Sequence, residues 1–147
     1  MTKFEFSLRR VLEFRRLHAH VARAALEASQ AEREELRGRQ RALAELRAAE
    51  EAAVREPGTS LSVLRLESHD RMQSYVLVTR ERFAREQAQL ENRIRAQRAV
   101  VVEADRQVGL LEKLEGRQQA HWQGLMDREL EELAADAYRS RAHRAGR

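Results

Sequence analysis

The chain has 147 residues, of which 35% are charged and 5% aromatic, with a single proline at Pro57. This composition is typical of long helices or coiled coil, so a compact enzyme with a thick apolar core is not expected. The 28 basic and 24 acidic residues leave a net charge of +4. Because the two signs alternate along the chain, they cancel the long-range field that nucleic-acid binding requires.

The first predicted helix covers residues 4–55. Thr2 and Glu5 have the spacing of a capping box at its start, and Pro57 with Gly58 marks its end. Its apolar residues follow the three–four spacing of a coiled-coil seam, interrupted by polar residues at Arg15, Ser29, Arg33 and Gln40. The seam residues are Leu8, Leu12, Ala19, Ala22, Leu26, Leu36 and Leu43.

The second predicted helix covers residues 61–140, after a turn at 56–60. Its seam is interrupted near residues 68–83, and i,i+4 pairs such as Glu67 with Arg71 support it by about 0.2–0.5 kcal/mol each. No strand-like alternation competes with this pattern. The seam residues are Leu61, Leu64, Met72, Tyr75, Leu90, Ile94, Val101, Val108, Leu111, Trp122, Leu125 and Leu133.

The sequence therefore predicts an all-α fold, a single domain over 1–147 in which two long helices form an antiparallel coiled-coil hairpin. The alternative is an intermolecular bundle of the same helices. Pairing outward from the turn puts Phe4 near residue 114. The longer second helix then overhangs the terminal end of the hairpin by about 25 residues, and a thin rod of this kind buries little surface by itself.

Catalytic, metal and cofactor sites are not expected. His18 and His20 are two residues apart and point in different directions on a helix, while His69 and His121 have no second cluster of ligands beside them. There is no phosphate-binding glycine loop, and two helices enclose no pocket that could tune carboxyl groups for catalysis. We predict a protein that is not an enzyme and binds no cofactor.

The compartment can also be predicted. The chain has no cysteine, which fits a reducing environment, and no stretch approaches the roughly 20 apolar residues of a membrane span. Arginines at 9, 10, 15 and 16 interrupt any signal-peptide core at the N-terminus. We expect a cytoplasmic protein.

The segment from Phe4 to Leu17 carries two apolar stripes. Phe4, Leu8, Val11 and Leu12 form one, and Phe14, Leu17 and Val21 form a second, displaced one. Two stripes suit a helix that is contacted by its partner helix on one side and by a separate protein on the other. Packing of both stripes within the hairpin, or binding to a membrane surface, are the alternatives.

Three segments near the ends of the chain form a recognisable set: "FEFSLRRVLEFRRL", "LLEKLEGRQQAHW" and "RELEELAADAYRSR". They resemble the N-terminal signature, the Leu-Glu-Lys-Leu segment and the C-terminal close of the flagellar export protein FliJ family, although Glu131 stands where the family commonly has Asp. The middle of the chain is not specific. The signature positions at the N-terminus are Phe4, Phe6, Leu8, Val11, Leu12, Arg15 and Arg16.

The resemblance implies a stalk shaped like the central coiled coil of the rotary ATPase γ subunit. It implies insertion into the hexameric flagellar export ATPase, promotion of ring assembly and activity, a link to the cytoplasmic domain of the export gate at the inner membrane, and contact with export chaperones. Candidate ATPase-binding residues lie at the terminal end: Phe4, Phe6, Leu8, Val11, Arg15, Trp122, Leu125, Met126, Leu130 and Leu133. Candidate export-gate-binding residues lie toward the loop: Gln40, Leu43, Tyr75 and Leu77.

Two other functions fit the composition. A nucleic-acid-binding coiled coil needs arginine gathered on one face and an affinity that falls steeply with salt. A purely structural coiled-coil dimer binds no ATPase and has twice the monomer mass in solution.

Overall fold

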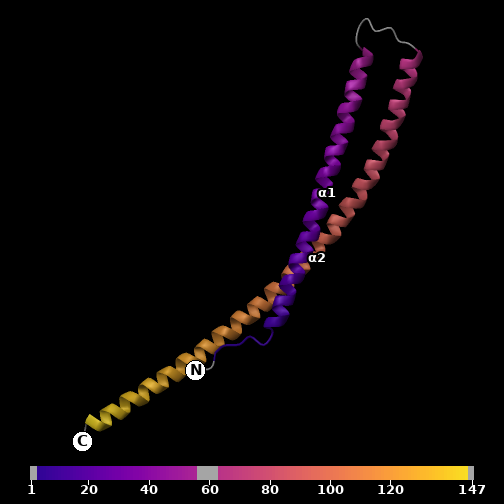
Figure 1. Cartoon of the computed structure of the whole chain (residues 1–147). Helices are drawn as coiled ribbons and strands as arrows, with labels where there is room; N and C mark the ends of the chain where they lie inside the picture. The colour runs from indigo at the N-terminus through magenta and orange to yellow at the C-terminus, as the bar shows by residue number, and fades with distance from the viewer. Residues whose placement is uncertain (1–2, 56–62, 146–147) are drawn as a thin grey trace. The chain divides into compact units, whose positions relative to one another are not determined.

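A computed structural model describes residues 3–55 and 63–145, and these form two α-helices, α1 (Arg9–Arg55) and α2 (Val63–Ala145) (Figure 1). The helices contain 47 and 83 residues. No strand occurs in the described ranges, so the predicted all-α fold of two long helices is confirmed. The predicted turn at 56–60 and the N-cap at Thr2 lie outside the described residues.

The N-terminus of α1 differs from the prediction, because the helix begins at Arg9 rather than at residue 4. The Leu12 N–H donates to the Leu8 carbonyl at 2.9 Å, the first helical bond, and the Arg9 N–H donates to the Phe6 carbonyl at 3.1 Å. Residues 3–6 have no regular structure, and the Phe6 side chain is only 4% exposed. Burial of the Phe6 side chain therefore outweighs the modest preference of these residues for helix. We call residues 3–8 the lead-in.

Contacts divide the chain into two compact units. The single domain over 1–147 stays a prediction. The first unit contains residues 1–20 and 102–147, and the second contains residues 21–101. Each unit holds one part of α1 and one part of α2.

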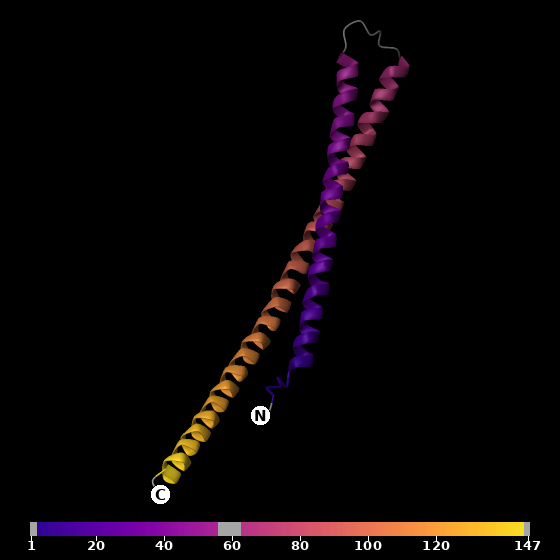
Figure 2. The same ribbon diagram turned by 60° about the vertical axis from the view of Figure 1, so that its left-hand side comes forward.

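In the second unit α1 and α2 lie side by side and antiparallel (Figure 2). Arg39 pairs with Glu86 at 2.7 Å, and seven residues earlier on α1, Glu32 pairs with Arg93 at 2.9 Å, seven residues later on α2. Its core is formed by Leu36, Leu90 and Ile94, with Leu26 and Phe83 packed against them.

The polar positions predicted within the seam of α1 do lie in the interface. Ser29 is buried, and Arg33 and Gln40 are half-buried. On α2, however, Tyr75 is 57% exposed and its neighbour Val76 is 2% exposed. The seam thus passes through Val76 rather than Tyr75, because the apolar spacing slips within residues 68–83 and the smaller β-branched side chain faces α1.

In the first unit α1 and α2 also run antiparallel. Arg16 pairs with Glu112 at 2.8 Å, and Arg9 pairs with Glu115 at 3.8 Å. Its buried apolar side chains are those of Phe6, Leu12, Ala19 and Ala104.

The register between the helices differs from the predicted one. A tight turn centred on Gly58 would place Arg39 opposite Leu77, whereas its carboxylate partner is Glu86. At the start of α2 the side chains of Val63, Leu64 and Leu66 are exposed. In the first unit Phe4 contacts Trp122 rather than residues near 114.

Neither described helix contains a stretch that is long and apolar enough to cross a membrane.

Candidate functional site

In the first unit, one face of α2 is covered by the N-terminal part of the chain. Ala104, Val108, Leu111, Glu115 and Trp122 recur at intervals of three, four and seven residues, so they share one side of the helix. Ala104 is buried and the other four are half-buried. This covered face is the continuation of the predicted coiled-coil seam.

The part of α2 that the N-terminal segment covers ends at an aromatic contact. The rings of Phe4 and Trp122 have their centroids 6.1 Å apart, with the ring planes tilted by 49°. Tilted rings at this separation attract through the positive edge of one and the negative face of the other. The lead-in thus reaches Trp122 and leaves only part of its indole exposed.

Beyond Trp122 the apolar face of α2 continues and is largely exposed among the described residues. Met126 is half-buried, Leu125 and Leu130 are exposed, and Leu133 is 66% exposed. All residues from 127 to 144 are exposed. Within this unit no other helix runs beside that part of α2, which is coloured yellow in Figures 1 and 2. We call Trp122, Leu125, Met126, Leu130 and Leu133 the terminal face.

Carboxylates surround the terminal face. Between Asp127 and Asp136 there are five acidic residues and one basic residue, Arg128. Asp136 pairs with Arg139 at 3.2 Å. The other four, Asp127, Glu129, Glu131 and Glu132, have no ion-pair partner among the described residues. Elsewhere in the molecule glutamates at the helix interfaces pair with an arginine of the other helix, as Glu112 and Glu86 do.

The structure brings the ten predicted ATPase-binding residues into one unit, but not all of them are accessible. Trp122, Leu125, Met126, Leu130 and Leu133 form the terminal face, with Phe4 at its edge. Phe6 is buried, so it fastens the lead-in and presents no surface to a partner. Leu8, immediately before α1, and Val11, within α1, are exposed. Arg15 is half-buried.

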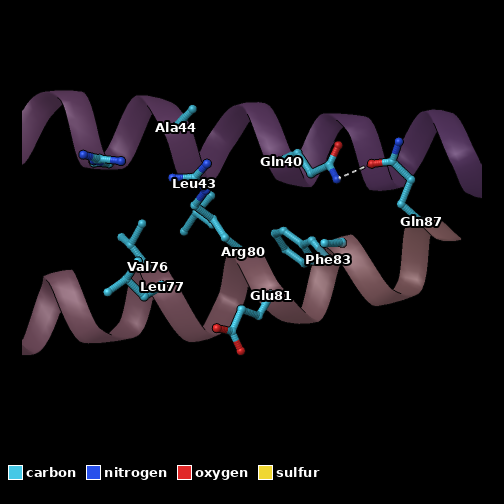
Figure 3. A pocket seen from close by; sticks show the side chains of 11 residues that line it. Gln40, Leu43, Ala44, Val76, Leu77, Arg80, Glu81, Phe83 and Gln87 are labelled. Atoms are coloured by element: carbon cyan, nitrogen blue, oxygen red, sulfur yellow. Dashed lines mark hydrogen bonds between the residues drawn. The ribbon is translucent and has the colours of Figure 1, made fainter.

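The four predicted export-gate-binding residues lie in the second unit, and three of them line a groove between α1 and α2. The groove has a volume of about 820 Å³ and is lined mainly by apolar surface. Val76 and Phe83 point from α2 toward α1, and Gln40 donates a hydrogen bond to Gln87 at 3.0 Å (Figure 3). Its lining residues are Gln40, Leu43, Ala44, Arg47, Val76, Leu77, Arg80, Glu81, Phe83, Ala84 and Gln87.

The predicted four are not equivalent. Leu43 is 7% exposed and so contributes mainly to packing, while Leu77 is 60% exposed at the groove. Tyr75 is exposed but does not line the groove.

Sequence reasoning missed Phe83, whose ring lies 5.5 Å from the guanidinium carbon of Arg39. The signal that could have found it is that only four phenylalanines occur in the chain and this one alone lies outside the N-terminal segment.

The described residues include no group of three or more His, Asp or Glu side chains that could hold a metal ion. Comparison of the chain with models of protein families, with characterised proteins and with solved structures gives no match.

Proposed function

We propose that this protein is a non-enzymatic stalk of the flagellar type III export apparatus. Its terminal end inserts into the hexameric export ATPase and promotes assembly and activity of the ring. Its other end contacts the cytoplasmic domain of the export gate, which brings the protein to the cytoplasmic side of the inner membrane. Export chaperones are further candidate partners. The support is the FliJ-like sequence at both ends together with the geometry of the terminal face.

The observation that carries the proposal is that the apolar face of α2 continues beyond the part that α1 and the lead-in cover. The same side of the helix packs against α1 and the lead-in as far as Trp122. Beyond that point Met126 is half-buried, and Leu130 and Leu133 are exposed. Burying one such side chain stabilises a complex by about 1.5–3 kcal/mol, before the entropic cost of association. An exposed apolar stripe that continues an existing helix interface is suited to a partner protein that packs on that side of the helix.

The groove in the second unit supports the second contact. It combines apolar side chains with the exposed Leu77 and the guanidinium of Arg80, for which no ion pair occurs among the described residues. Concave apolar sites with a few polar groups are the usual form of a binding site. Leu77 and Tyr75 are the gate contacts we propose to test, because Leu43 and Gln40 also hold the helices together.

The experiment mixes the purified protein with the flagellar export ATPase of the same organism and follows ring formation by light scattering alongside ATP hydrolysis. Wild type should stimulate both. The double variant Leu130→Ala, Leu133→Ala should need at least about tenfold more protein for the same effect, because side chains at an interface centre carry most of the binding energy. Trp122→Ala should act in the same direction.

The matched control is Leu110→Ala, which removes an exposed leucine of α2 in the same unit that does not belong to the terminal face. It should behave like wild type. A wild-type protein that stimulates neither ring formation nor hydrolysis would contradict the stalk proposal. A doubled mass in that preparation would then favour a structural coiled-coil dimer, and steeply salt-dependent binding to DNA or RNA would favour a nucleic-acid-binding coiled coil.

A further inference from the structure

The first unit itself shows what kind of surface covers this side of α2. The covering element, α1, contributes buried apolar side chains at Leu12 and Ala19. It also contributes arginines at the edge of the interface: Arg16 Nη2 donates to Glu112 Oε1 at 2.8 Å, and Arg9 lies 3.8 Å from Glu115. An amphipathic helix with basic flanks thus covers an apolar α2 face with acidic flanks.

The terminal face also combines apolar side chains with carboxylates at its edge, but no helix with basic flanks covers it among the described residues. Leu130 and Leu133 continue the apolar stripe, and Glu129, Glu132 and Asp136 lie along one edge of it at i, i+3 and i+7. In the described part of the chain, the only basic group paired with these three carboxylates is Arg139, which binds Asp136. The face is therefore continuous with an existing interface and lacks the cations found there.

A second copy of the chain packed in parallel is a poor occupant of this face. Two terminal faces aligned in this way would bring the carboxylates of residues 127–136 from both copies together. Like charges placed across an interface oppose association. A partner with basic flanks instead neutralises them and gains the ion pairs that α1 makes with Glu112 and Glu115.

We propose that the terminal face binds an amphipathic helix of a partner protein whose apolar stripe is flanked by arginine or lysine. This inference rests on the docking role that the proposed function gives to the terminal face, and it adds the chemistry of the partner. In the export ATPase, it assigns the contact to a helix with exposed basic residues rather than to a purely apolar collar.

The test uses two synthetic helical peptides of three heptads that share one leucine stripe and differ only at the flanking positions, which carry lysine in one and glutamate in the other. Binding to the full-length protein is followed by anisotropy of a label on the peptide and by the emission of Trp122, the sole tryptophan. The lysine peptide should bind at least about tenfold more tightly at low salt, and the difference should shrink at about 0.5 M salt.

Two sets of variants locate the binding. Leu130→Ala with Leu133→Ala should abolish binding of the lysine peptide. Glu129→Gln, Glu132→Gln and Asp136→Asn together should remove the preference for lysine over glutamate. The matched control neutralises three exposed carboxylates of the second unit, Glu45→Gln, Glu67→Gln and Asp70→Asn, and should keep the preference.

Equal binding of the two peptides, no binding of either, or a preference that survives neutralisation of the terminal-face carboxylates would each overturn the inference. So would a doubled mass in light scattering that Leu130→Ala with Leu133→Ala reverses, because the face would then belong to a second copy. Lysine-peptide binding in a protein that fails to stimulate the ATPase would overturn the proposed function and leave this inference standing. Stimulation of the ATPase without any peptide preference would overturn this inference and leave the proposed function standing.

Discussion

Phe4 and Trp122, 118 positions apart in the sequence, lie with their ring centroids 6.1 Å apart. This contact fastens the non-helical lead-in to α2 at the point where the covered part of the α2 face ends and the terminal face begins. Phe4 and Phe6 therefore have a structural role within the first unit. Part of the Trp122 indole remains exposed to a partner.

Phe4→Ala should shift the emission of Trp122 to longer wavelength, because removing the phenyl ring admits water to the indole. The lost aromatic contact should lower the free energy of unfolding by about 0.5–1.5 kcal/mol. Emission spectra and urea unfolding followed at the same wavelength measure both effects.

The control for this variant is Phe14→Ala, since Phe14 is an exposed phenylalanine in the same unit. Its Trp122 emission should match that of wild type. An unchanged spectrum in Phe4→Ala would mean that the lead-in does not rest on Trp122 in solution.

Leu36→Ala should be strongly destabilising. Leu36 is 1% exposed and packs with Leu90 and Ile94, so the substitution removes apolar contacts and leaves a cavity that costs about 2–5 kcal/mol. Thermal unfolding followed by circular dichroism measures the loss. Leu46→Ala, an exposed leucine in the same unit, should stay within about 0.5 kcal/mol of wild type. Similar losses in both variants would argue against the assigned core.

Gly116→Ala should stabilise the protein. Gly116 lies inside α2, and a Cβ added there meets no atom within 4 Å. Alanine avoids the backbone entropy that glycine loses in a helix, so the free energy of unfolding should rise by up to about 1 kcal/mol. Chemical unfolding followed at 222 nm measures the gain. Gly124→Ala provides a second site with the same surroundings, and a loss of stability at both would contradict a continuous helix through this region.

Ala84→Leu should partly fill the groove of the second unit. Ala84 is exposed and lines the same groove as Phe83 and Leu43. A larger apolar side chain there should gain contacts and add about 0.5–2 kcal/mol to the free energy of unfolding. Thermal unfolding measures the gain. Ala49→Leu, at an exposed position of α1 that does not line the groove, should leave stability nearly unchanged. If the export gate binds in the groove, Ala84→Leu should also weaken that binding.

Much of the secondary structure could be predicted from the sequence, because it depends on local patterns. The scarcity of glycine and proline, the three–four apolar spacing and the lack of strand-like alternation are sufficient for two long helices. The burial of Leu12, Leu36 and Ile94 follows from the same spacing. The ten candidate ATPase-binding residues were predicted from the sequence, and their role in binding stays a prediction.

Three features were decided by tertiary contacts. Burial of Phe6 makes α1 begin at Arg9 rather than at residue 4, because one buried aromatic ring outweighs several weak helix preferences. The register that joins Arg39 to Glu86 depends on how side chains fit across the interface, which a turn position alone does not determine. Finally, only the contact of Phe4 with Trp122 shows where the covered face of α2 stops and the uncovered face starts. Helix formation depends on neighbouring residues, whereas the register of the two helices and the exposure of their side chains depend on residues brought together from distant parts of the chain.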